Sequence, residues 1–126
     1  MKSLKKRKVL LVDDSVTSQL LVQNIFLDEN IEILVASDAT EAMNILTKIK
    51  PDLILLDIMM PEIDGYQMLG MLEKKSDVAD IPVMMISAKT GASHVKKAID
   101  SGAVDYVKKP IDVDDLLTRV KKVLNL

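Results

Sequence analysis

The stretch Leu53-Ile54-Leu55-Leu56-Asp57 is a continuous apolar run that ends in a carboxylate. A run without polar alternation is typical of a parallel strand covered on both faces, so we predict a central strand here. Three more runs, apolar except for Asp105 in the last of them, each end in, or just before, a residue that can handle phosphate or a hard metal ion. They are residues 9–12 before Asp13 and Asp14, residues 83–86 before Ser87, and residues 104–107 before Lys108, Lys109 and Pro110.

Strand-like and helix-like segments alternate five times along the chain. Residues 31–36 supply the remaining strand, and helical spacing with capping residues predicts helices over residues 15–28, 38–50, 66–74, around 95–99 and 112–124. Short right-handed crossovers between parallel strands place helices on both faces of the sheet. The sequence therefore predicts an α/β fold, a doubly wound (βα)5 unit with a five-stranded parallel sheet in the order 2-1-3-4-5.

Composition limits the chain to a few classes of protein. Its 126 residues, 48% of them hydrophobic, suit one domain with a buried core. The absence of cysteine excludes disulfides and thiolate zinc sites, and one histidine cannot form a histidine metal cluster. We expect a cytoplasmic protein without membrane insertion, because no apolar run approaches the length of a membrane span.

Charge is distributed unevenly along the sequence. The formal net charge is −2, and setting aside the five basic residues among the first eight leaves 12 basic against 19 acidic residues, or −7. An acidic body disfavours direct nucleic acid binding. We predict a basic tail over residues 1–7 and a single folded domain over residues 8–126.

Three carboxylates are predicted to meet at one edge of the sheet. Asp13 and Asp14 alone are better interpreted as caps of the next helix, but Asp57 ends the neighbouring strand of a 2-1-3-4-5 sheet. Ligands of such sheets bind at the carboxyl ends of the strands, where the strand order reverses. Crowded carboxylates repel one another unless a cation lies among them, and Mg²⁺ prefers oxygen ligands. A divalent metal site is therefore predicted.

Two further side chains at this edge suit a phosphoryl group. Lys109 is a compact cation that can pair with a carboxylate or a phosphoryl group, although a surface lysine is the alternative. Lys108 is the better candidate for the surface, since neighbouring strand residues point to opposite faces. Ser87 offers a hydroxyl, with helix capping as its alternative role.

Four separated motifs resemble the receiver domain of two-component response regulators, which has a CheY-like, flavodoxin-like fold. They are Val12-Asp13-Asp14, the run from Leu55 through Asp57 and Pro61 to Gly65, Ser87-Ala88-Lys89, and the run from Gly102 to Pro110. The resemblance covers residues 8–124. It implies a signalling domain that catalyses only its own phosphorylation and dephosphorylation, rather than an enzyme acting on other substrates.

The resemblance implies a role for each matching residue. Asp57 would accept a phosphoryl group from a histidine kinase or phosphotransfer protein. Asp14, Asp57 and the backbone carbonyl of Met59 would bind Mg²⁺ directly, and Asp13 would bind it through water. Lys109 and Ser87 would hold the phosphoryl oxygens, and the Lys109–Pro110 bond would be cis. Tyr106 would move with Ser87 as a switch, for which core filling is the alternative role.

The same resemblance implies an output surface. A downstream protein would bind the face formed by the fourth helix, the fifth strand and the fifth helix; whether phosphorylation also drives homodimerisation stays open. A stand-alone regulator is expected because the chain ends after its last helix. A domain cut from a larger regulator or hybrid kinase is the alternative.

Other functional classes fit the sequence less well. A haloacid-dehalogenase-like phosphatase would need an acid two residues after its nucleophile, where Met59 stands. A nonphosphorylatable interaction domain would be expected to lack one of the acids or Lys109. A flavin-binding domain would need a phosphate-binding loop where Asp13 and Asp14 lie, and carboxylates repel phosphate. Bulky Met59 also predicts slow self-dephosphorylation.

Overall fold

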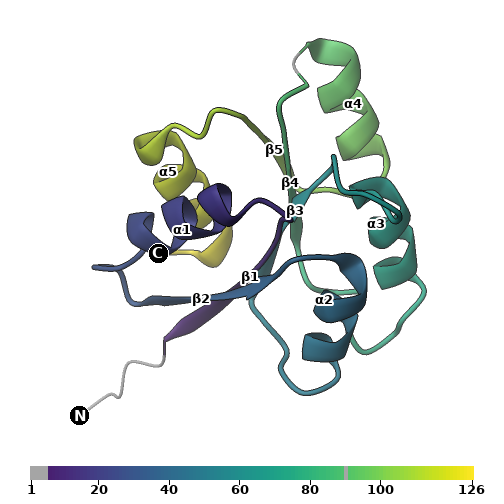
Figure 1. Cartoon of the computed structure of the whole chain (residues 1–126), viewed down its shortest axis with the longest axis horizontal. Coiled ribbons are helices and arrows are strands. Elements are labelled where there is room, and N and C mark those ends of the chain that lie inside the picture. Colours follow the sequence, from purple (N-terminus) through teal and green to yellow (C-terminus); the bar gives the residue numbers. More distant parts are fainter. Residues whose placement is uncertain (1–5, 90) are drawn as a thin grey trace.

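The protein forms a three-layer structure with a parallel sheet between two layers of helices (Figure 1). The computed structural model describes residues 6–89 and 91–126. Its strand order, β2-β1-β3-β4-β5, confirms the predicted order and places β3 at the centre. The strands are β1 (Arg7–Val12), β2 (Ile31–Ala36), β3 (Leu53–Asp57), β4 (Val83–Ser87) and β5 (Asp105–Lys108).

The helices divide between the two faces of the sheet. They are α1 (Val16–Ile25), α2 (Ala39–Leu46), α3 (Gly65–Glu73), α4 (Ala92–Asp100) and α5 (Val113–Leu124). Helices α1 and α5 lie together on one side, and α2, α3 and α4 lie on the other (Figure 1).

Each apolar strand supplies both halves of the core. In β3, Leu53 and Leu55 pack with α1 and α5, whereas Ile54 and Leu56 pack with α2, α3 and α4. All four are fully buried. Successive strand residues point to opposite faces, so a strand covered on both sides must be apolar at every position. This requirement explains the continuous runs in the sequence.

The strand register brings the polar ends of the strands to one edge. Val12 pairs with Leu56, Asp57 with Ile86, and Ser87 with Lys108. The residues that follow β1 and β5 therefore lie level with the last residues of β3 and β4.

Several element boundaries differ from the predicted ones. Arg7, assigned to the basic tail, is the first residue of β1, where its backbone N–H and guanidinium donate to the carbonyls of Asn30 and Leu124. The rest of the predicted tail, apart from Lys6, lies outside the described residues. Helix α1 ends at Ile25 rather than residue 28, and α2 ends at Leu46 rather than residue 50.

Aspartates begin three of the helices. Asp38 and Asp112 cap α2 and α5 as predicted, each accepting a backbone N–H three residues on. Asp64 caps α3 in a full capping box with Gln67, which the sequence analysis did not identify. Val113 shares the apolar helical spacing of α5, but it is 46% exposed because it stands in the first turn, before the buried residues Leu116, Val120 and Leu124.

Within residues 6–89 and 91–126, no helix has the length and apolarity that crossing a membrane requires.

Candidate functional site

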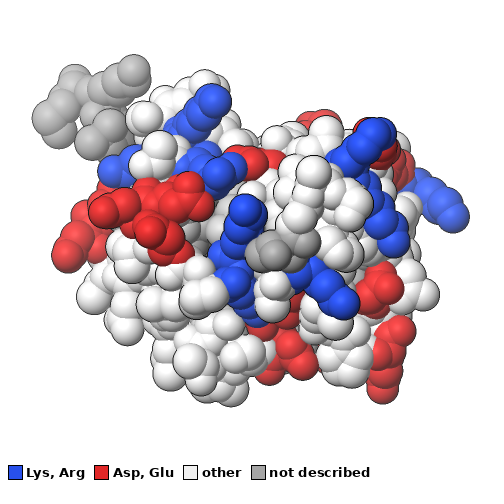
Figure 2. Space-filling model, turned by 90° about the horizontal axis from the view of Figure 1, so that it is seen from above, with Lys and Arg blue, Asp and Glu red and all other residues white. Residues whose placement is uncertain are grey.

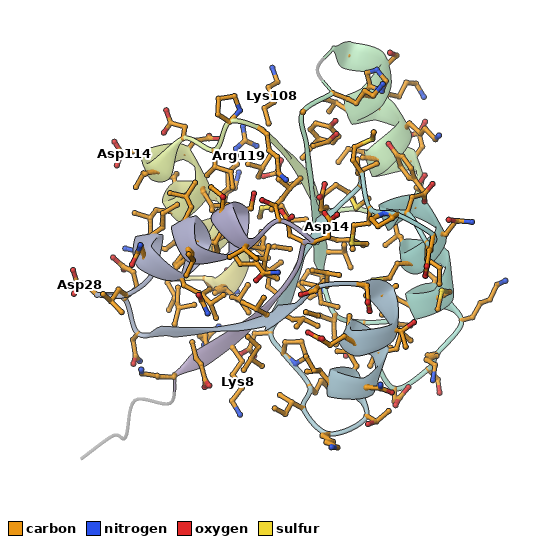
Figure 3. The ribbon with its side chains drawn as sticks, viewed as in Figure 1. Lys8, Asp14, Asp28, Lys108, Asp114 and Arg119 are labelled. Atoms are coloured by element: carbon orange, nitrogen blue, oxygen red, sulfur yellow. The ribbon has the colours of Figure 1, made fainter. Side chains whose placement is uncertain are left out.

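Three carboxylates gather where β1 and β3 end. One oxygen from each of Asp13, Asp14 and Asp57 lies within 4.8 Å of the others, the spacing of ligands around one metal ion. Asp13 and Asp57 are buried, whereas Asp14 is exposed at the rim. Asp14 is labelled near the middle of the view in Figure 3, just after the end of β1. The predicted convergence of these residues is therefore present in the fold.

Lys109 reaches into this cluster from the loop after β5. Its Nζ lies 2.9 Å from Asp13 Oδ2 and 3.5 Å from Asp57 Oδ2. Burial disfavours the ammonium form, but the two carboxylates outweigh that effect and raise the pKa of Lys109 above its usual value. Lys108 points away into solvent at the upper edge of Figure 3, as its predicted surface role requires.

The surroundings of Asp57 disfavour its ionised form. Burial, and then the nearby charge of Asp13, raise its pKa from 3.8 to about 6, although Lys109 and the backbone N–H of Met59 oppose the shift. That N–H donates to Oδ1 at 3.1 Å, so Oδ2 faces Lys109. An added cation would relieve the repulsion that remains.

The geometry separates the roles that Asp13 and Asp14 can take. Both oxygens of Asp13 are engaged, Oδ1 with the backbone N–H of Ser15 at 2.9 Å and Oδ2 with Lys109. Asp14 presents its carboxylate to solvent. The donor set fits a hard divalent cation, because it consists of carboxylates beside the loop backbone that follows β3.

Ser87 ends β4 as a fully buried residue. Its Oγ accepts the backbone N–H of Lys89 at 3.1 Å, and its carbonyl accepts the backbone N–H of Lys109 at 2.9 Å. The Lys109–Pro110 bond is cis, as the resemblance implied. A backbone hydrogen bond thus joins the end of β4 to the loop after β5 that carries Lys109.

Tyr106 lies on β5 with its ring buried. Its hydroxyl donates to the carbonyl of Lys89 at 2.6 Å. Tyr106 therefore connects β5 to the loop after β4. In that loop, the backbone N–H of Lys89 also donates to Ser87 Oγ.

The roles of two residues of the site, Gly65 and Gln19, were not predicted from the sequence. A Cβ at Gly65 would lie 2.7 Å from the carbonyl oxygen of Asp57 and 2.7 Å from Cα of Ile58, so only glycine permits this approach of α3 to β3. Its place directly after the cap Asp64 was the available signal. Gln19 donates to the Asp13 carbonyl at 2.7 Å from α1, and nothing in the sequence marks it.

A family model for the response regulator receiver domain matches residues 9–121, almost the whole chain. The chain belongs to this family. Among solved structures, the receiver resembles the chemotaxis protein CheY4 of Vibrio cholerae, at a TM-score of 0.86 and 27% identity, over 93% of this chain and 98% of that one. A response regulator from Thermotoga maritima gives a TM-score of 0.86 and 28% identity, over 96% and 99% of the two chains.

Curated relatives of the receiver include regulators of transcription. The DNA-binding dual master transcriptional regulator RpaA of Synechocystis is 33% identical over 117 residues, which are 93% of this chain and 48% of RpaA. The DNA-binding response regulator MtrA of Mycobacterium leprae is 32% identical over 116 residues, 92% of this chain and 50% of MtrA. The chain spans about half the length of these relatives.

Proposed function

We propose that Asp57 accepts a phosphoryl group from the phosphohistidine of a histidine kinase or phosphotransfer protein. An Asp57 carboxylate oxygen attacks phosphorus, the P–N bond breaks, and the freed imidazole takes up a proton. The product is an acyl phosphate. The observation that supports the proposal is that the carboxylates of Asp13, Asp14 and Asp57 lie together at one edge of the sheet, with the Lys109 ammonium group in contact with Asp13 and Asp57.

Positioning and charge dispersal drive this reaction, because a carboxylate needs no general base to attack phosphorus. Mg²⁺ would be held by Asp14, Asp57 and the Met59 carbonyl, with Asp13 bound through water. The engagement of both Asp13 oxygens supports this division. When bound, the ion neutralises charge on the phosphoryl oxygens. Lys109 would pair with one of those oxygens, and the Ser87 hydroxyl would donate to another.

Helix α1 offers a surface for the donor protein. Its residues carry no charge, and Val16 and Leu20 at its exposed side are 65% and 57% exposed. These positions recur at helical spacing, and α1 begins directly after Asp14 and its neighbour Ser15. A donor helix packed on this stripe would lie next to the acceptor carboxylate.

Tyr106 and Ser87 would transmit the modification as a population shift. Ser87 would move toward the phosphoryl group, and the Tyr106 ring would fill the space that Ser87 leaves. The partner then binds the face of α4, β5 and α5. The hydrogen bond from Tyr106 to the Lys89 carbonyl supports the link, because it joins β5 to the β4–α4 loop. A test is the Tyr106 χ1 population with and without beryllofluoride: a change in this population is expected, and equal populations contradict the switch.

Phosphoryl transfer itself is tested with phosphoramidate and a partner kinase as donors. Wild-type protein should take up one acid-sensitive phosphoryl group in Mg²⁺ and none in excess chelator. Asp57→Asn should lose labelling, whereas Asp28→Asn, at the far end of α1 in Figure 3, should keep it. Undiminished labelling of Asp57→Asn, or labelling indifferent to chelator, refutes the proposal.

A further inference from the structure

A pocket lies beside the carboxylate cluster, between the loop after β3, the start of α3 and α4. Its volume is about 560 Å³, within the range of pockets that bind ligands. It is lined by Ile58, Met59, Met60, Asp64, Tyr66, Ser87, Lys89, His94, Lys97 and Tyr106. The proposed phosphoryl transfer uses only part of this lining and gives no role to the α3 and α4 side chains.

The floor of the pocket is apolar and aromatic. Ile58 and Met60 are buried, and both tyrosines of the chain, Tyr66 and Tyr106, line the pocket. Met59, 56% exposed, stands at the mouth. Methionine side chains adapt to differently shaped apolar groups, and tyrosine rings offer large rigid contact areas. Such a floor suits apolar side chains rather than a strongly hydrated ligand.

The polar groups of the lining are mainly basic. Lys89 comes from the β4–α4 loop, and His94 and Lys97 lie one turn apart on α4. Lys97 Nζ lies 4.3 Å from the centroid of the Tyr66 ring, which holds its charge over the pocket. The single carboxylate, Asp64, already accepts the backbone N–H of Gln67 in the α3 cap.

This basic lining contrasts with the acidic chain around it. Net charge is −2 for the sequence, yet Lys and Arg side chains occupy the middle of the face seen in Figure 2 and the part of it over α4. Because the basic groups come from two elements, they match several carboxylates spread along one segment better than a single small anion. Charge of this kind also speeds encounter with an acidic partner.

We propose that this pocket binds a short segment of a partner protein whose apolar side chains are flanked by carboxylates. The apolar side chains fill the space between Met60, Tyr66 and Tyr106, and the carboxylates pair with Lys97 and Lys89. Binding itself requires no phosphoryl group, so the proposal stands or falls separately from the chemistry at Asp57. The pocket lies between α4 and the start of α3, and no residue of α5 lines it.

Fluorine NMR tests the proposal directly, because the only two tyrosines of the chain both line the pocket. The unmodified full chain is labelled with 3-fluorotyrosine and titrated with the acetylated peptide EDLFDLLDE. We expect both resonances to shift with one dissociation constant on the order of 10 to 100 μM, a typical range for a short docking segment. Absence of any shift at millimolar peptide overturns the proposal.

A charge-matched pair of variants locates the binding. Lys97→Glu should weaken the peptide about tenfold or more, whereas Lys96→Glu should weaken it less than about twofold. Lys96 is the neighbouring exposed α4 lysine, which pairs with Asp100 at 2.6 Å and does not line the pocket. Equal losses in the two variants would assign the effect to overall charge and contradict the site.

Control ligands separate the peptide from other occupants. Replacing the acids by lysine, or the apolar residues by serine, should abolish the fluorotyrosine shifts. Phenylacetate alone should bind at least about tenfold more weakly than the peptide, because it offers a single carboxylate. Equal affinity for phenylacetate would identify a small-molecule pocket and overturn the assignment to a protein segment.

Discussion

At the scale of single residues, the site is a balance of buried charges. Two buried carboxylates share one ammonium group, and the second contact of Lys109, at 3.5 Å from Asp57, is longer than a good hydrogen bond. Lys109 therefore neutralises the negative charge of Asp57 only in part, and this agrees with the raised pKa of Asp57. A bound metal ion would therefore stabilise the ionised form of Asp57.

Asp57→Asn should stabilise the metal-free protein in a pH-dependent way. The folded protein keeps the Asp57 proton up to about pH 6, whereas the unfolded carboxyl loses it near 3.8. The free energy of unfolding of the wild type therefore falls as pH rises through this interval. The variant should be more stable by on the order of 1 to 3 kcal/mol at pH 7.5 and by much less at pH 4.5. Urea unfolding in chelator measures both values.

Asp28→Asn, an exposed site on the opposite end of α1, is the control for this experiment. An equal effect of Asp57→Asn at the two pH values would show that ionisation of Asp57 does not oppose folding.

Lys109→Met should separate metal binding from phosphoryl transfer. Removing the ammonium group leaves Asp13 and Asp57 without their cation, so Mg²⁺ affinity should rise roughly three- to tenfold. The rate of phosphorylation should nevertheless fall by about tenfold or more, because a group holding the phosphoryl oxygens is lost. Calorimetry and labelling kinetics measure the two effects. Weaker Mg²⁺ binding in the variant would argue against competition between Lys109 and Mg²⁺ for the carboxylates.

Met59→Asn should shorten the life of the acyl phosphate. Met59 stands two residues after Asp57 and is half exposed, where its side chain can block water in line with the P–O bond. An amide there can hold a water by hydrogen bonds, so dephosphorylation should accelerate roughly three- to tenfold. Decay of labelled protein after donor removal gives the rate. An unchanged lifetime would contradict the proposal that Met59 slows hydrolysis of the acyl phosphate.

At the scale of elements, the start of α3 is fixed against the end of β3. The backbone N–H of Gly65 donates to the Ile58 carbonyl at 3.0 Å, and Asp64 caps the helix immediately before it. This contact sets the path of residues 58–64, which carry Met59 past the carboxylates. Packing of one helix end therefore contributes to the geometry of the site.

Two glycines in α3 give a matched test of that contact. Gly65→Ala places a Cβ 2.7 Å from backbone atoms of Asp57 and Ile58, so it should cost about 1 to 3 kcal/mol of unfolding free energy. Gly70→Ala meets nothing within 4 Å in the same helix and should stabilise by about 0.5 to 1 kcal/mol. Urea unfolding of both decides the point; equal effects would contradict the close approach.

Sequence patterns predicted the elements better than their ends. Continuous apolar runs identified the strands because burial on both faces leaves no other choice of residue. The ends of α1 and α2 were predicted too late, since Phe26 and Ile49 keep helical spacing although the chain has already turned at those positions. Helix ends depend on backbone hydrogen bonds that side-chain periodicity does not specify.

At the scale of the whole molecule, strand order decides which residues meet. Asp13 and Lys109 are 96 positions apart, yet their side chains are 2.9 Å apart. The carboxylate and lysine cluster could be predicted because it needs only the sheet order and the strand ends. Gln19, and the pocket between α3 and α4, could not, because both depend on how helices are set on the sheet rather than on any local pattern.

The central claim is that Asp57, among 19 acidic residues, receives the phosphoryl group. The most direct measurement treats the protein with acetyl phosphate and Mg²⁺, reduces it with borohydride, and maps the product by mass spectrometry. The account predicts homoserine at position 57 and unmodified aspartate at positions 13 and 14. Reduction at another carboxylate, or none in protein that carries the phosphoryl mass, would contradict it.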